Sequence, residues 1–85
     1  TSLMANVLIY LSASQYNSRV IERGAQIAKL NHASMSAVFV QTAKYENLSV
    51  ASKRQLQQNI KYAEDKGAKV TILYGQDPIR QLVLN

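Results

Sequence analysis

Two groups of residues have the types and positions needed to bind a phosphorylated small molecule. Ser12-Ala13-Ser14 follows the apolar stretch Asn6–Leu11 and precedes a run with helical spacing, and Gly75-Gln76-Asp77-Pro78 follows a β-rich stretch. Hydroxyls, loop amides and a helix N-terminus together suit a nucleotide or a phosphate. No glycine-rich phosphate-binding or dinucleotide-binding motif is present. From the pattern alone the simpler explanation is slightly favoured, in which the serines cap a helix and Gly75 makes a turn.

The acidic residues and the single histidine do not form a recognisable catalytic set. Catalytic carboxylates must converge in pairs in one cleft, and only Asp77 follows an expected strand. His32 leads into the second expected strand, at the end of a parallel sheet opposite to the one where sites form. One histidine and no cysteine also predict no metal site. We expect this domain to have no catalytic and no metal-binding residues.

The charge of the chain does not by itself identify a partner. The net charge is +5, yet the ten Lys and Arg residues are scattered singly except for Lys53-Arg54. No nucleic-acid-binding motif accompanies them, so we expect no nucleic-acid partner. No apolar stretch approaches the roughly 18 residues that would cross a bilayer. These features predict a cytoplasmic domain that does not insert into the membrane.

Apolar periodicity predicts alternating strands and helices. Expected strands are Asn6–Leu11, Met35–Gln41 and Ala68–Tyr74, and expected helices are Ser18–Asn31, a second one from Ser49 to about Lys66, and a third from Ile79. Gly67 is placed to end the second helix. Right-handed crossovers would give a parallel sheet with strand order 3-2-1 in a three-layer α/β/α architecture with helices on the faces.

The chain reads as one partial domain over residues 1–85. It begins at Thr1 without an initiator Met, and its last expected helix stops within the apolar run Ile79–Val83. The strand at Asn6–Leu11 is the most apolar one, yet it has a neighbour on one side only. A long apolar edge invites pairing with another strand. We therefore expect a C-terminally truncated domain, with further strands or a partner chain at that edge.

Four segments together resemble a universal stress protein domain, most closely the one in KdpD-type osmosensitive potassium sensor histidine kinases. They are NVLIYLSAS, RVIERGAQIAKLNHA, SAVFVQT and AEDKGAKVTILYGQDP. The resemblance covers the chain from Ala5 onward. It implies an adenine nucleotide α-hydrolase-like fold. It also implies a cytoplasmic regulatory module within a membrane-bound histidine kinase that controls the potassium and osmotic response.

The resemblance also implies a ligand. Some KdpD-type domains bind cyclic di-AMP through Ser-x-Ser and a later Phe-Thr-Ala-x-Tyr. The matching positions here are Ser12-Ala13-Ser14 and, after the gap Gln15–Ser34, Met35-Ser36-Ala37-Val38-Phe39. Ala37 matches, Ser36 replaces Thr, and Met35 and Phe39 replace Phe and Tyr, which weakens stacking and hydrogen bonding. ATP-binding members usually carry Asp where Ser12 stands, so cyclic di-AMP is expected ahead of ATP.

Three functions remain open at this stage. The first is a regulatory module whose ligand site is lined by Ser12, Ser14, Ala37, Phe39 and the Gly75–Asp77 turn. The second is a stand-alone universal stress protein that acts as a homodimer through its exposed sheet edge, with or without ATP binding. The third is a small-molecule enzyme of the nucleotide α-hydrolase type, which the lack of convergent acids disfavours.

Overall fold

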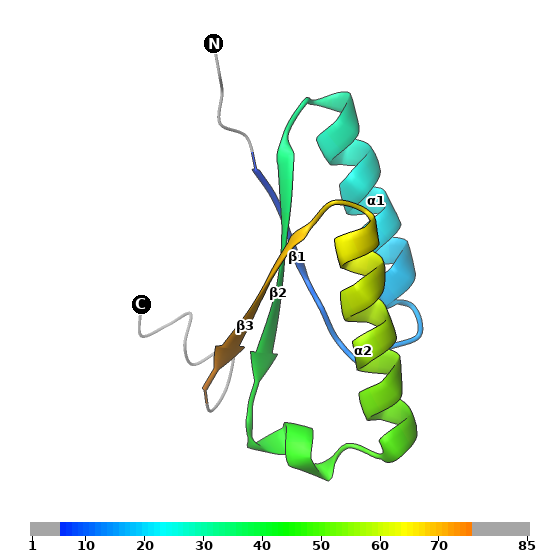
Figure 1. Cartoon of the computed structure of the whole chain (residues 1–85), viewed down its shortest axis with the longest axis vertical. Helices are drawn as coiled ribbons and strands as arrows, with labels where there is room; N and C mark the ends of the chain where they lie inside the picture. The colour runs from blue at the N-terminus through cyan, green and yellow to red at the C-terminus, as the bar shows by residue number, and fades with distance from the viewer. Residues whose placement is uncertain (1–5, 76–85) are drawn as a thin grey trace.

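The computed structural model describes residues 6–75, in which strands and helices alternate (Figure 1). The elements in chain order are β1 (Asn6–Tyr10), α1 (Asn17–Leu30), β2 (Ser34–Gln41), the short 3-10 helix η1 (Ala43–Asn47), α2 (Val50–Asp65) and β3 (Lys69–Tyr74). The strands and the two long helices lie within a few residues of the ranges expected from the sequence. The helix expected from Ile79 lies outside the described residues.

The three strands form one parallel sheet in the order β1-β2-β3. This confirms the predicted strand order of 3-2-1. Val7 lies opposite Met35, and Ala37 lies between Ile9 on one side and Val70 on the other. Because all strands run the same way, their carboxyl ends meet at one edge of the sheet.

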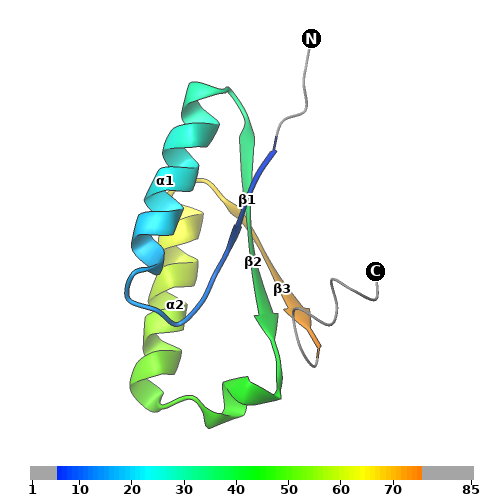
Figure 2. The ribbon, with the colours of Figure 1, turned by 180° about the vertical axis from the view of Figure 1, so that it is seen from behind.

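Both helices cover the same face of the sheet, as the two opposite views show (Figures 1 and 2). The chain steps from β1 to β2 to β3 in a single direction. Right-handed crossovers in one direction place every connecting helix on one side. The described residues therefore make two layers, and the helix-free face bears exposed side chains that include Leu8 and Tyr10, 51% and 53% exposed. The third layer of the expected architecture would need elements outside residues 6–75.

The core lies between the sheet and the two helices. It is a cluster of buried apolar side chains: Ile9, Leu11, Ile21, Ala28, Met35, Ala37, Ala63 and Ala68. Gly24 allows α1 to approach β1 closely, because a Cβ there would lie 2.8 Å from Ile9 Cγ2. Burying one large side chain such as Ile21 contributes about 1.5–3 kcal/mol.

A side-chain hydrogen bond joins the two helices across their outer surface. The Tyr62 hydroxyl of α2 donates to the Glu22 carboxylate of α1. This hydrogen bond raises the pKa of the Tyr62 phenol, and partial desolvation and the negative charge of Glu22 act in the same direction. The contact links α1 and α2 at an exposed position.

Both helices end in the same hydrogen-bonded turn. At the end of α2, Ala68 N donates to Ala63 O at 2.9 Å, and Gly67 takes the predicted left-handed conformation with φ of 95°. At the end of α1, Ala33 N donates to Ala28 O at 2.8 Å, but the left-handed residue is His32, with φ of 51°. In each helix the left-handed residue also donates to the carbonyl three residues earlier, Gly67 N to Glu64 O at 2.9 Å and His32 N to Lys29 O at 3.3 Å. The two bonds at each helix end make a Schellman motif, which favours glycine at the left-handed position.

Replacing His32 with glycine should stabilise the chain. A side chain in the left-handed region costs roughly 1–2 kcal/mol, so we expect His32→Gly to raise the free energy of unfolding by about 1 kcal/mol. Gly67→Ala should lower it by a similar amount. Chemical denaturation followed by circular dichroism measures both. His32→Ala is the control, because it removes the imidazole but keeps the Cβ. An equal gain from His32→Ala would contradict backbone strain as the cause.

Candidate functional site

The loop between β1 and α1, residues 11–16, is held partly by its own serine side chains, and we call it the serine loop. Ser14 N donates to Ser12 Oγ at 3.2 Å, and Tyr16 N donates to Ser14 Oγ at 3.1 Å. Each hydroxyl thus accepts from the amide two residues further along the chain, a turn that serine commonly makes. A serine hydroxyl has one proton of its own to donate. Ser12 and Ser14 are exposed, so both protons can reach a ligand.

The buried side chain of Asn17 closes the end of β1. Leu11 N donates to Val38 O of β2 at 2.8 Å, so the carbonyl of the same peptide group, Tyr10 O, points away from β2. Asn17 Nδ2 donates to Tyr10 O at 3.2 Å, and Asn17 Oδ1 accepts from Ser12 N at 3.1 Å. The carboxamide therefore takes the place that a neighbouring strand would occupy.

Asn59 of α2 holds the same loop from the other side. Its Nδ2 donates to Ser12 O at 2.8 Å and to Ser14 O at 2.9 Å. Its Oδ1 accepts from Gln55 Nε2 at 3.0 Å. Within the described part of the chain, Asn17 and Asn59 are the buried polar residues, 5% and 3% exposed. Burial of an amide is unfavourable without such hydrogen bonds, so both side chains have a defined structural role.

Sequence reasoning missed both asparagines. The signal for Asn59 was present, because it stands on the helical stripe formed by Leu56, Ile60 and Ala63, which was expected to be buried. A polar residue on a buried stripe must find a hydrogen-bonding partner. Asn17 gave a weaker signal, since asparagine is also common in polar loops.

Phe39 and Gly75 lie at the same edge of the sheet as the serine loop. Phe39 is the next residue after Val38, whose carbonyl accepts from Leu11 N. Gly75 N donates to Gln41 O at 3.1 Å, which places Gly75 beside the end of β2. Ala13 lies within the loop and is half-buried. Ser12, Ala13, Ser14, Phe39 and Gly75 thus all lie at the carboxyl end of the sheet, and Gln76 and Asp77 lie outside the described residues.

An aromatic pair extends this edge towards α2. The Phe39 and Tyr45 rings meet edge to face, with their centroids 6.3 Å apart. Lys53 Nζ of α2 lies 5.1 Å from the centroid of the Tyr45 ring. Cations are attracted to the face of an aromatic ring at such distances. Tyr45 and Lys53 were not among the residues expected from the sequence.

Met35 and Ser36 lie far along β2 from the loop, and Ala37 is buried in the core. Met35 lies opposite Val7, five residues before Ser12, which corresponds to about 16 Å of strand. Met35 and Ala37 are buried beneath the helices. Ser36 faces the other side of the sheet, where its Oγ donates to Asn6 Oδ1 at 3.3 Å. These three residues serve the core and the opposite end of the sheet in the described chain.

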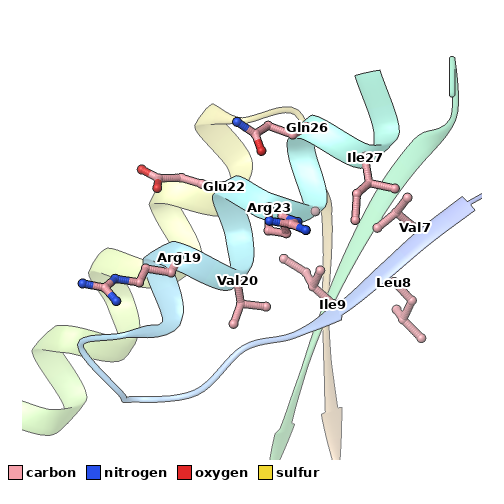
Figure 3. A pocket seen from close by; sticks show the side chains of 10 residues that line it. Val7, Leu8, Ile9, Arg19, Val20, Glu22, Arg23, Gln26 and Ile27 are labelled. Carbon is pink, nitrogen blue, oxygen red and sulfur yellow. The ribbon is translucent and has the colours of Figure 1, made fainter. Parts of the chain in front are cut away.

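A cavity of about 650 Å³ lies where α1 overhangs β1, beside the edge of β1 that pairs with no other strand in residues 6–75 (Figure 3). Its apolar side chains come from both elements: Val7, Ile9, Val20 and Ile27. Arg19 and Arg23 of α1 also line it. Ser12 and Ser14 do not, so this cavity is distinct from the serine loop.

Two further features bear on the kind of site. Across residues 6–75, no three His, Asp or Glu side chains gather closely enough to hold a metal ion. In the same range, no helix has the length and apolar character needed to span a bilayer.

Comparison with known proteins assigns the fold. No family model matches the sequence. The chain is similar to the crystal structure of a universal stress protein in complex with cAMP, with 19% identity over 98% of its own length and a TM-score of 0.63. The chain has the fold of a universal stress protein. It spans 64% of the length of that universal stress protein. The predicted parallel α/β fold is therefore confirmed.

Proposed function

We propose that this chain is a nucleotide-binding regulatory module of the universal stress protein type, with no chemistry of its own. The observation that carries the proposal is the serine loop after β1. Two exposed hydroxyls lie there on a backbone held by Asn17 and Asn59. Ligands of parallel α/β sheets bind outside the carboxyl ends of the strands, where this loop lies. A universal stress protein of similar fold binds cAMP.

The chemistry of this edge favours a nucleotide over other small molecules. The hydroxyl protons of Ser12 and Ser14 suit acceptors such as ribose oxygens, purine nitrogens and phosphate oxygens. The Phe39–Tyr45 pair supplies aromatic surface on which a base can stack. The net charge of +5 attracts an anionic ligand to the protein as a whole.

The finer assignment is to cyclic di-AMP, in the cytoplasmic part of a KdpD-type sensor histidine kinase. Two observations support this assignment. Ser12-Ala13-Ser14 and Phe39 resemble the motifs of such domains, and they lie at the same end of the sheet. Because Met35 and Ala37 are buried, we assign the ligand to Ser12, Ser14 and Phe39, which packs against the core but is only partly buried. The remainder of the kinase would then be the partner that responds to the ligand.

Removing the two hydroxyls should weaken ligand binding. Titration calorimetry of the chain with cyclic di-AMP, cAMP and ATP should give the tightest binding with cyclic di-AMP. One hydrogen bond contributes about 1 kcal/mol, so the double variant Ser12→Ala and Ser14→Ala should bind at least tenfold more weakly.

Ser34→Ala is the matched control, because Ser34 begins β2 at the opposite end of the sheet. It should leave the affinity unchanged. Absence of binding with all three nucleotides would contradict the proposal, and an equal loss in Ser34→Ala would place the ligand elsewhere.

A second candidate function is a stand-alone universal stress protein that dimerises through β1. It is favoured by the cavity beside β1 and by the edge of that strand that is unpaired within the described residues (Figure 3). Successive residues of a strand turn their backbone N–H and C=O groups to opposite sides. Because Leu11 N points to β2, the backbone groups of Leu8, three residues earlier, point away from β2. A twofold axis beside Leu8 would pair the two β1 strands antiparallel, with Leu8 opposite its copy.

Placing a positive charge at Leu8 should break such a dimer. Like charges directly opposite each other on neighbouring strands are destabilising, so Leu8→Lys should weaken dimerisation at least tenfold. Thr71→Lys is the control, because Thr71 lies on β3 at the other edge of the sheet. Analytical ultracentrifugation measures both. A monomer at every concentration, or disruption by Thr71→Lys alone, would contradict dimerisation through β1.

A further inference from the structure

The long-range support of the serine loop comes from one side chain of α2. Asn59 is 47 residues from Ser12 and 45 from Ser14, and its Nδ2 donates to the carbonyls of both. An amide nitrogen carries two protons, so this group is fully used by the loop. Two carbonyls that converge on one donor group repel each other when that group is absent. The curved path of the loop therefore depends on Asn59.

The orientation of the Asn59 carboxamide is itself fixed. Gln55, one helical turn earlier on α2, donates through Nε2 to Asn59 Oδ1. Only with the oxygen turned towards Gln55 does the nitrogen face the loop. A chain of hydrogen bonds thus runs from Gln55 through Asn59 to the backbone of Ser12 and Ser14.

The serine hydroxyls depend on this backbone path. Ser12 Oγ and Ser14 Oγ accept from the amides of Ser14 and Tyr16 only while the loop is curved. These bonds set the direction in which each hydroxyl proton can point. If the loop backbone lost this curvature, the two hydroxyls would remain but would no longer point towards the ligand.

Asn17 has a different part in the loop. It lies five residues from Ser12 and seven from Tyr10, so its hydrogen bonds form within the β1–α1 segment itself. Asn59 instead joins that segment to the second helix. The two asparagines can therefore be separated by experiment.

We propose that Asn59 is a positioning residue for the ligand, which couples α2 to the hydroxyls of the serine loop. The proposal rests on the nucleotide site proposed above. Without touching the ligand, Asn59 holds the backbone that presents Ser12 and Ser14. Ligand binding should in turn protect the hydrogen bonds that Asn59 makes.

The test combines ligand affinity with hydrogen exchange in the full chain. Asn59→Leu keeps the approximate volume and removes both donors. Exchange of the Ser14 and Tyr16 amides should become at least tenfold faster, measured by NMR relative to the Ala37 amide in β2. Because a lost buried hydrogen bond costs about 1.4 kcal/mol, the dissociation constant for cAMP or cyclic di-AMP should rise about tenfold.

Two further variants keep the result interpretable. Gln58→Leu, at an exposed position next to Asn59 on α2, should change neither quantity. Gln55→Leu leaves both Asn59 donors in place but frees the carboxamide to turn, so it should give smaller changes of about threefold in both quantities. If Asn59→Leu does not fold, Gln55→Leu takes its place as the test. Changes in both exchange and affinity would support the proposal, and no change in affinity would overturn it.

Wild-type exchange and wild-type affinity in Asn59→Leu would overturn the proposal. So would faster exchange with unchanged affinity, since that result makes Asn59 purely structural. If the wild-type chain binds neither nucleotide, the proposed nucleotide site fails. The coupling to a ligand then fails with it, while the exchange data still show whether Asn59 holds the loop.

Discussion

Right-handed crossovers between parallel strands determine where the other parts of this chain can lie. Because the chain moves from β1 to β2 to β3 without reversing, α1 and α2 share one face of the sheet. The serine loop, the end of β2 and Gly75 all lie at the carboxyl end of the sheet. The close approach of α1 at Gly24 follows from the same packing of helix on sheet.

The same constraint leaves both outer strand edges and one sheet face without a covering element in residues 6–75. At the carboxyl end of β1, Asn17 supplies the hydrogen bonds that a neighbouring strand would make. Further back along β1 the edge is open beside the cavity under α1. In the serine loop, backbone groups are therefore hydrogen-bonded to the side chains of Asn17 and Asn59. A ligand that meets this loop finds an organised surface.

Much of the fold could be predicted from the sequence. Apolar strands separated by helical runs are typical of a parallel sheet, and Ser49 caps α2 as expected, with its Oγ accepting from Ser52 N at 3.0 Å. From the sequence we expected helices on both faces, whereas strand order and handedness place both described helices on one face. His32 could not be predicted, because its left-handed conformation follows from the hydrogen bonds that end α1 and is unusual for a side chain other than glycine.

The candidate site was harder to predict. Ser12 and Ser14 were proposed because hydroxyls directly after a strand are a local signal. Asn59 escaped because its partners are backbone carbonyls far away in the sequence, which leave no pattern of residue types. Met35 and Phe39 were grouped by spacing, but four residues along a strand span about 13 Å. One end of that motif therefore lies at the carboxyl end of the sheet and the other within the core.

The central claim is that a nucleotide binds at the edge formed by the serine loop and the end of β2. NMR titration of the labelled chain with cAMP and with cyclic di-AMP tests it most directly. The account predicts that the largest amide shifts fall on Ser12, Ser14 and Phe39. Shifts confined to Val20 and Ile27 beside β1, or to Ser34 and Ser36 at the other end of the sheet, would contradict it.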